Sequence, residues 1–208
     1  MIAISTPAEQ RTVLENISWE TFEAILKEIG DNRGSRLAYD EGILEIMTPL
    51  FEHEIYKSNL GNLIIVLAEE LNIEIKSAGS TTLKIKVVKK GIEPDNCYYI
   101  ENESAVRGKL ELDLETAPPP DLAIEIDITS SSVDKFGIYA SLGVPELWRY
   151  NGRILEFYQL VESEYIECEF SIAFTFLSAT DMTRFVEQSK TIGEIALIKL
   201  FRDWLQTR

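Results

Sequence analysis

Cysteine and histidine are scarce in this chain of 208 residues. The two cysteines, Cys97 and Cys168, lie in apolar, strand-like contexts and lack the spacing of a metal site. We therefore interpret them as reduced thiols of the core. The only histidine, His53, falls on the apolar stripe of a predicted helix, so we interpret it as a satisfied, partly buried residue rather than a general base.

Long apolar runs are also missing. The stretch 60–71 is interrupted by Asn62, Glu69 and Glu70 and falls well short of a membrane-spanning segment. The first residues lack a basic region followed by an apolar core, so no secretory signal is predicted. We expect a cytoplasmic protein with a single domain over residues 1–208.

Basic residues are outnumbered, with 20 lysines and arginines against 35 aspartates and glutamates and a net charge of -15. This balance argues against a protein that coats nucleic acid, because tight non-specific binding rests on a broad basic surface. A nuclease stays compatible with it if basic residues are concentrated locally, or if bound metal offsets carboxylates at the site.

The hydrophobic pattern alternates between strand-like and helix-like segments. Apolar residues at helical spacing predict helices at 18–30, 52–72 and 136–143 and a C-terminal helical segment at 181–205. Strands are predicted at 37–39, 43–47, 80–90, 97–100, 121–128, 145–150, 154–161 and 165–170. The polar stretch 102–120 ends in three prolines, and this triple proline cannot form a regular helix.

Carboxylates interrupt two of the predicted strands. Asp95 stands at the entrance of one strand, and Glu125 and Asp127 lie inside another between isoleucines. Because side chains alternate along a strand, Glu125 and Asp127 point to the same face. Buried charges are normally paired or bound to a cation, and convergent carboxylates suit Mg²⁺. The alternative is an amphipathic strand whose carboxylates face solvent while its isoleucines face the core.

A serine run follows this strand and leads into a short helix. Ser131 with Asp134 three residues later fits a capping box, which places Lys135 in the first helical turn. From there the lysine could reach back to Glu125, orient a water and neutralise charge on a pentavalent phosphorane. The helix N-terminus adds a field that favours phosphate.

Four segments, taken together, resemble the Uma-type endonucleases, bacterial proteins classed as a domain of unknown function within the PD-(D/E)XK nuclease superfamily. The segments are Glu93-Pro94-Asp95, residues 119–127, residues 134–139 and residues 143–148. The resemblance extends from about Gly42 to Tyr150. It implies a restriction-endonuclease-like α/β (α+β) fold, with a mixed β-sheet flanked by helices.

The resemblance also implies roles for individual residues. Asp95 becomes the first metal ligand and Glu125 the second. The superfamily's lysine two residues after the glutamate is replaced here by Asp127, which we treat as a candidate third ligand. In the Uma-type proteins a lysine four residues before a tyrosine takes its place, and Lys135 with Tyr139 matches this spacing.

Three further residues are candidates for the site. An acidic residue of the early helix often completes such sites, and Glu54 lies at the matching helix start; the alternative is an acid favoured there by the helix macrodipole. Lys84 and Lys86 share one strand face within the densest basic cluster and are candidates for contact with nucleic-acid backbone. Their alternative is a solvated sheet face.

The leading hypothesis is a Mg²⁺-dependent endonuclease acting on DNA, with Mn²⁺ as a substitute metal. One alternative is a catalytically silent binding module that keeps the nuclease fold. Another is a metal-dependent hydrolase of a small phosphorylated substrate. We also expect a homodimer, for which the apolar segment 195–205 could supply the interface; ordinary core packing is the alternative.

Overall fold

The computed structural model describes residues 10–30, 34–129 and 131–208. The strands form two sheets. The first is five-stranded and antiparallel, in the order β1 (Gln10–Leu14), β3 (Ile43–Thr48), β2 (Arg36–Asp40), β6 (Lys90–Ile92), β5 (Leu83–Ile85). The second is six-stranded, in the order β11 (Glu164–Cys168), β10 (Leu155–Val161), β9 (Glu146–Tyr150), β8 (Leu122–Ile126), β7 (Asn96–Tyr99), β4 (Lys76–Ser77).

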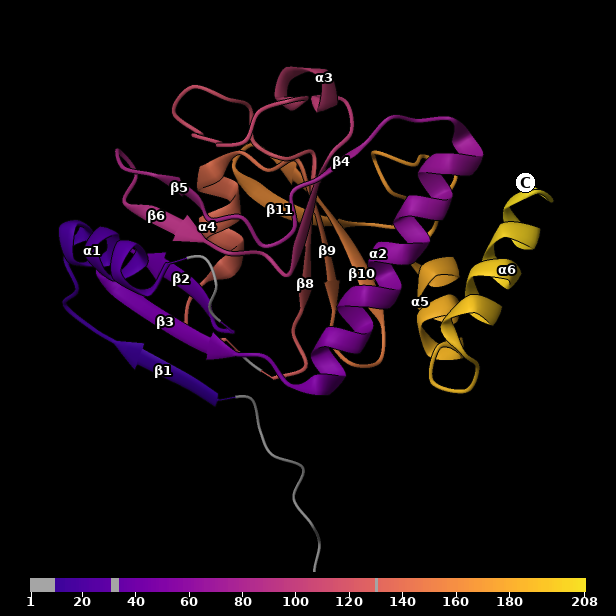
Figure 1. The fold of residues 1–208 in the computed structure, drawn as a ribbon, viewed down its shortest axis with the longest axis horizontal. Coiled ribbons are helices and arrows are strands. Elements are labelled where there is room, and N and C mark those ends of the chain that lie inside the picture. The colour runs from indigo at the N-terminus through magenta and orange to yellow at the C-terminus, as the bar shows by residue number, and fades with distance from the viewer. Residues whose placement is uncertain (1–9, 31–33, 130) are drawn as a thin grey trace, which may run out of the picture.

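The second sheet is mixed, because β8 and β9 run parallel while its other neighbouring strands pair antiparallel. The helices are α1 (Trp19–Ile29), α2 (Phe51–Leu71), α3 (Glu103–Val106), α4 (Lys135–Leu142), α5 (Ala179–Gln188) and α6 (Glu194–Leu205). Figure 1 shows α1 over the five-stranded sheet at one end of the molecule and α5 and α6 at the other. The expected α/β class with a mixed sheet and flanking helices is confirmed.

The second sheet was not expected, and one predicted strand is wrong. Residues 80–90 do not form one strand: β5 and β6 are separated by a turn at residues 86–89. Leu83 is fully buried, but Val87, the third apolar residue of the alternating pattern, is 87% exposed in this turn. Lys89 adopts a positive φ of 51°, which reverses the chain direction. The alternation of apolar and polar residues in the sequence therefore extends beyond β5 into turn residues that face solvent, where it does not indicate a strand.

Local signals place the helices well. Ser18 caps α1 by accepting a hydrogen bond from the Thr21 amide at 3.1 Å, and Gly30 ends the helix at a φ of 63°. The helix expected at 18–30 is thus confirmed. The C-terminal helical segment is also confirmed, as the two helices α5 and α6. Within the described residues, no helix has the length and apolar character needed to cross a membrane.

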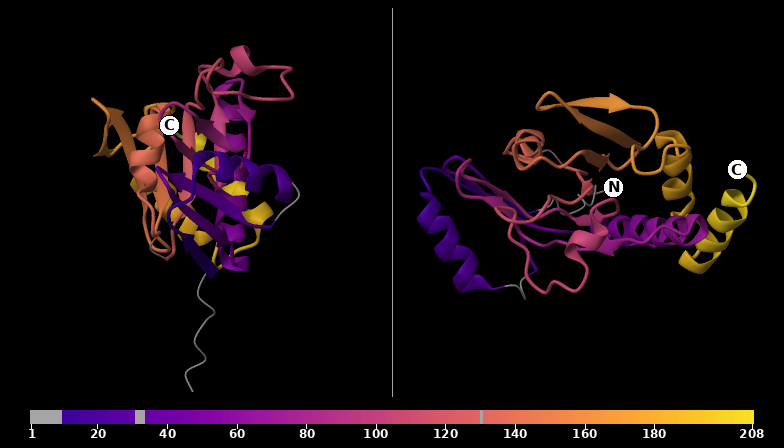
Figure 2. Two further views of the ribbon diagram at one scale, coloured as in Figure 1. Left: turned by 90° about the vertical axis from the view of Figure 1, so that its left-hand side faces the viewer. Right: turned by 90° about the horizontal axis from the view of Figure 1, so that it is seen from above.

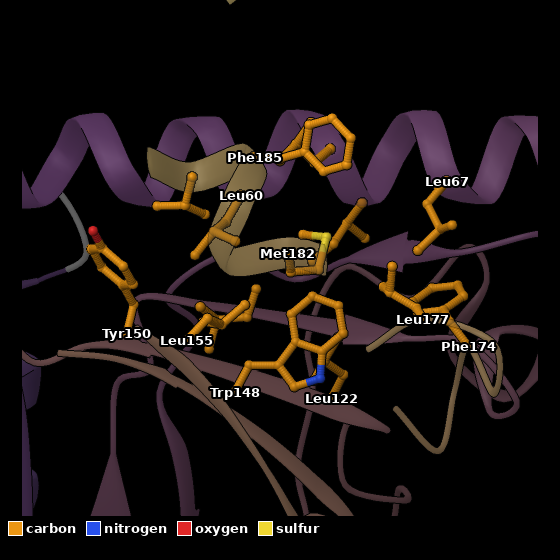
Figure 3. Close-up of a cluster of buried hydrophobic side chains, with 14 of the residues drawn as sticks. Leu60, Leu67, Leu122, Trp148, Tyr150, Leu155, Phe174, Leu177, Met182 and Phe185 are labelled. Atoms are coloured by element: carbon orange, nitrogen blue, oxygen red, sulfur yellow. The ribbon is translucent and has the colours of Figure 1, made fainter. Parts of the chain in front are cut away.

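One face of the six-stranded sheet is covered by α2 and α5, and α6 packs against these two helices. Figure 3 shows Leu60 of α2, Trp148 of β9 and Phe185 of α5 meeting in this layer. Each of these three side chains is at most 1% exposed. Burial of such large apolar side chains contributes roughly 2–3 kcal/mol each, so this layer holds α2 firmly on β8 and β9.

The opposite face of this sheet meets α4, which packs against both sheets. Figure 2 shows the two sheets from above, with α1 and α6 at opposite ends of the molecule. A smaller cluster of Trp19, Phe22 and Tyr39 fixes α1 on the five-stranded sheet, where Phe22 and Tyr39 stack with ring centroids 4.7 Å apart. Residues on the α4 side of β8 are therefore enclosed between the sheets.

Strand β8 is buried on both of its faces. Leu122, Ile124 and Ile126 pack toward α2, whereas Ala123 belongs to the cluster around α4. By alternation Glu125 shares the α4 face, and it is only 3% exposed. The alternative of a solvent-facing Glu125 on an amphipathic strand is therefore wrong, because α4 covers the face that would otherwise meet water.

Both cysteines are free thiols. Cys97 is fully buried, and this burial raises the pKa of its thiol to about 12. Cys168 is half-buried and packs against the main core. A thiol with so high a pKa carries almost no thiolate at neutral pH, which agrees with the interpretation of Cys97 as a structural residue.

Candidate active site

Asp95 and Glu125 lie opposite each other on neighbouring strands. In the antiparallel pair of β7 and β8, Asn96 pairs with Ile124, so Asp95 immediately before β7 comes opposite Glu125. The Asp95 amide donates to the Ile124 carbonyl at 3.1 Å, which holds this register. Both residues are at most 3% exposed. Burial raises the pKa of Glu125, and the charge of Asp95 adds to the rise while Lys135 opposes it.

Helix α4 delivers two partners to Glu125. Lys135 Nζ lies 2.5 Å from Glu125 Oε2, and the Tyr139 hydroxyl donates to Oε1. The two residues are one helical turn apart and therefore share a face of α4. Burial lowers the pKa of Lys135, but the charges of Glu125 and Asp95 outweigh it, so this pKa is raised. Lys135 is thus a permanent cation at neutral pH.

The start of α4 differs from the expected capping box. Asp134 is the cap, and its Oδ1 accepts from the Gly137 amide at 3.1 Å. The Ser131 hydroxyl instead donates to Glu45, whose Oε2 also accepts from the Ser132 amide at 2.7 Å. Glu45 is 1% exposed and takes these donors because a buried carboxylate needs several. Lys135 nevertheless occupies the first turn of α4, as the sequence predicts.

His53 of α2 contacts Asp95, which the sequence did not indicate. Its Nε2 lies 3.1 Å from Asp95 Oδ2, and the Ile126 amide donates to the same oxygen at 2.7 Å. Burial alone would raise the pKa of Asp95, but His53, Lys135 and the Ile126 amide hold it below its usual value. His53 is fully buried. One feature of the sequence could have indicated this contact: His53 is an ionisable residue on the otherwise apolar stripe of α2.

Glu54 does not face Asp95 in this arrangement. Its side chain is 43% exposed and pairs with Lys57 at 3.1 Å, with Arg36 at a longer 3.9 Å. Its Oε1 lies 3.8 Å from His53 Nδ1. The contact of α2 with the carboxylate pair is therefore made by His53, one residue before the expected position.

Asp127 is held by two arginines. Arg149 Nε and Nη2 lie 3.1 and 3.0 Å from its Oδ2, and Arg11 Nη2 lies 3.6 Å from its Oδ1. Arg149 was missed by the sequence reasoning. The alternation of side chains along β9 could have located it, because Arg149 lies two residues after Leu147 and so shares the face that points toward α4.

A pocket of about 260 Å³ opens beside this group. Its walls include Glu125, Asp127, Ser131, Lys135, Phe136 and Arg149. Within the described part of the chain, no cluster of three or more histidine, cysteine or acidic side chains suited to a metal is present. The pocket thus presents three carboxylates, Glu125, Asp127 and Asp134, with two cations, Lys135 and Arg149, and Asp95 lies opposite Glu125 on the neighbouring strand.

Lys84 and Lys86 lie outside this pocket. Lys84 pairs with Glu23 and lines a separate, larger cavity of about 750 Å³ beside α1 and β5. Lys86 is exposed in the turn after β5. The larger cavity contains neither Asp95 nor Glu125, so size does not identify the site here. Contact of these two lysines with nucleic acid stays a prediction.

Asp121, at the end of the triple proline, serves the fold instead of the pocket. Its Oδ2 accepts from the Ile100 and Asn102 amides at 2.6 and 3.0 Å, and Oδ1 accepts from Asn102 Nδ2 at 2.6 Å. Replacing it leaves the buried Ile100 amide and the part-buried donors of Asn102 without these partners. We expect Asp121→Ala to lower the free energy of unfolding by about 2–4 kcal/mol in urea titrations. The exposed Asp203→Ala control is expected to change it by less than about 0.5 kcal/mol. Equal stability of the two variants would contradict this.

Comparisons with known proteins bear on the fold and the family of this chain. The crystal structure of a "putative nuclease belonging to DUF820" from Anabaena variabilis is similar, with a TM-score of 0.52 and 14% sequence identity. The match covers 82% of this chain and 99% of that one, which shows a shared fold. No curated protein matches the sequence. The family model Uma2, described as "Putative restriction endonuclease", matches residues 19–188. The chain therefore belongs to the Uma2 family, whose nuclease fold it shares.

Proposed function

We propose that this protein is a divalent-metal-dependent endonuclease of the PD-(D/E)XK type that hydrolyses phosphodiester bonds of DNA. One observation carries the proposal: Asp95 and Glu125 lie opposite each other in a buried position, with Lys135 2.5 Å from Glu125. Family membership supports the same reaction class. Cytoplasmic location and self-association belong to the proposal as well, but Leu197, Phe201 and Leu205 are buried in the core, which favours ordinary core packing for the segment 195–205.

The donor chemistry fits a hard divalent cation such as Mg²⁺ or Mn²⁺. Carboxylate oxygens are the ligands that these ions prefer, and two facing carboxylates in a buried position repel each other unless a cation lies near. Burial and the charge of Asp95 raise the pKa of Glu125, whereas Lys135 opposes this rise. Asp95 and Glu125 would hold the ion, which when bound supplies charge neutralisation for the phosphate and a more acidic water.

The chain's own residues would prepare the reacting groups. The Tyr139 hydroxyl donates to Glu125 and fixes the direction of its carboxylate. His53 and the Ile126 amide do the same for Asp95. The Lys135 ammonium, charged at neutral pH, is placed to stabilise negative charge that develops on the phosphate in the transition state. The walls of α4 and β9 limit access of bulk water to this face of Glu125.

Metal removal tests the proposal. We expect cleavage of supercoiled plasmid and of DNA oligomers with Mg²⁺ or Mn²⁺, and none with a chelator. Titration calorimetry with Mn²⁺ is expected to detect binding to the wild type and its loss in Asp95→Ala, with folding checked by circular dichroism. Cleavage that persists undiminished in chelator would contradict a metal-dependent mechanism.

A catalytically silent binding module is the second candidate. It is favoured by one observation: both oxygens of Glu125 already have partners, because Lys135 and Tyr139 occupy them. Absence of both Mn²⁺ binding and cleavage, with oligomer binding retained, would support it. The pocket of about 260 Å³ also admits a small phosphorylated substrate, so nucleotides should be tested as competitors of DNA cleavage.

A further inference from the structure

Arg149 occupies a place in the site to which the proposed function gives no role. In the parallel pair of β8 and β9 it lies directly opposite Glu125. Both residues line the pocket of about 260 Å³ together with Lys135. The Arg149 side chain is 32% exposed, whereas that of Lys135 is 11% exposed. Of these two cations, Arg149 is therefore the more accessible to a ligand.

Asp127 orients the Arg149 guanidinium. Nε and Nη2 lie 3.1 and 3.0 Å from Asp127 Oδ2, so one edge of the guanidinium is held. Tyr158 of β10 also contacts the group, while Nη1 lies 3.8 Å from Glu156 Oε2, beyond hydrogen-bond distance. An arginine has five N–H donors, more than Asp127 and Tyr158 together engage. Donors of Arg149 are therefore left for a further acceptor.

Glu125 and Asp127, the two carboxylates beside Lys135 and Arg149, are both paired with cations. Glu125 is paired with Lys135 at 2.5 Å. Asp127 is shared between Arg149 and Arg11, the latter at 3.6 Å. Asp134 also lines the pocket and Glu156 lies 3.8 Å from Arg149 Nη1, so an anion bound here depends on the hydrogen-bond donors of Arg149 and not on a net positive wall. The volume of about 260 Å³ is several times the roughly 30 Å³ that one water occupies, which leaves room for a phosphate group with waters.

We infer that Arg149 binds a phosphate group of the DNA backbone in this pocket, and that Asp127 is the positioning residue that orients it. This inference rests on the proposed nuclease function. The planar fork of a guanidinium matches the oxygens of a phosphate, and a carboxylate behind it fixes the fork in one direction. Asp127, which the sequence suggested as a metal ligand, therefore influences phosphate binding by orienting Arg149.

Steady-state cleavage of a DNA oligomer tests the inference, with oligomer affinity measured separately by fluorescence anisotropy in Ca²⁺ at several salt concentrations. Arg149→Met is expected to raise KM about 10-fold to 100-fold, the loss of one charge-assisted hydrogen-bonded contact. It should also reduce the salt slope of binding by about 0.7–0.9, as for one phosphate contact. Arg149→Lys is expected to show a smaller rise in KM. Arg153→Met, at an exposed arginine after β9, is the matched control.

Asp127→Asn separates positioning from a merely structural role. It is expected to raise KM with kcat within about 3-fold of the wild type, because the arginine remains but loses its fixed direction. Should Arg149→Met fail to fold, the neutral variant Arg149→Gln decides by the same criteria. A wild-type KM and salt slope in the Arg149 variants, with the wild type cleaving DNA, would overturn this inference and leave the nuclease function standing. A wild type that neither binds nor cleaves the oligomer overturns the proposed function and this assignment with it.

Discussion

Asp95→Asn and Glu125→Gln are each expected to lower the rate of DNA cleavage at least about 100-fold to 1,000-fold, the range found for removal of one electrostatic contact to a transition state. In each variant the side-chain amide keeps the shape of the replaced carboxylate but lacks the negative charge that would hold a divalent cation. The Ile126 amide and the Tyr139 hydroxyl keep an oxygen acceptor in these variants. Glu125→Gln also removes one member of the buried ion pair with Lys135, so a loss of about 3–5 kcal/mol in the free energy of unfolding is expected there, and cleavage is compared at a temperature at which each variant is folded.

Single-turnover cleavage of a DNA oligomer with Mg²⁺ measures this effect, and thermal unfolding of each variant checks the fold. Glu167→Gln is the matched control, because Glu167 is an exposed glutamate of β11 outside the pocket. It is expected to cleave at the wild-type rate. Cleavage within 3-fold of the wild type in both site variants would remove Asp95 and Glu125 from the mechanism.

Lys135→Met is expected to destabilise the metal-free protein by about 3–5 kcal/mol at neutral pH, because the change removes one member of a buried ion pair. The Lys135 and Glu125 side chains are only 11% and 4% exposed, so solvent does little to screen the charge left behind. Asp95 adds a second negative charge at the same place. Methionine keeps the apolar stem of lysine, which limits the loss of packing.

Urea unfolding in chelator and in Mn²⁺ measures this second effect. Mn²⁺ is expected to restore part of the lost stability, because an ion that binds only the folded state stabilises it by mass action. Lys86→Met, at the exposed lysine after β5, is the control and is expected to stay within about 0.5 kcal/mol of the wild type. An unfolding free energy equal to the wild type in chelator would show that Lys135 does not neutralise the carboxylates.

Most of the elements could be predicted from local sequence patterns. Ser18 marks the start of α1 by capping it with its side chain, and Gly30 marks its end by its backbone conformation. The alternation of apolar and polar residues located the hairpin of β2 and β3. Strand β1 was missed, because Gln10–Leu14 is mostly exposed and shows no burial pattern. The turn at residues 86–89 was missed because Val87 continues an apolar alternation into solvent.

By itself, the sequence indicated the α/β class and the closeness of Lys135 to Glu125, while Tyr139 entered only through the resemblance to the Uma-type proteins. Glu125 lies only ten residues before Lys135, and the strand and helix that carry them follow each other directly, so their meeting depends on local spacing. Only the tertiary structure decided that His53 meets Asp95, that Arg149 meets Asp127 and that Arg11 meets Glu45. These contacts join separate elements, and hydrophobic periodicity specifies which face of an element is buried but not which element lies against it.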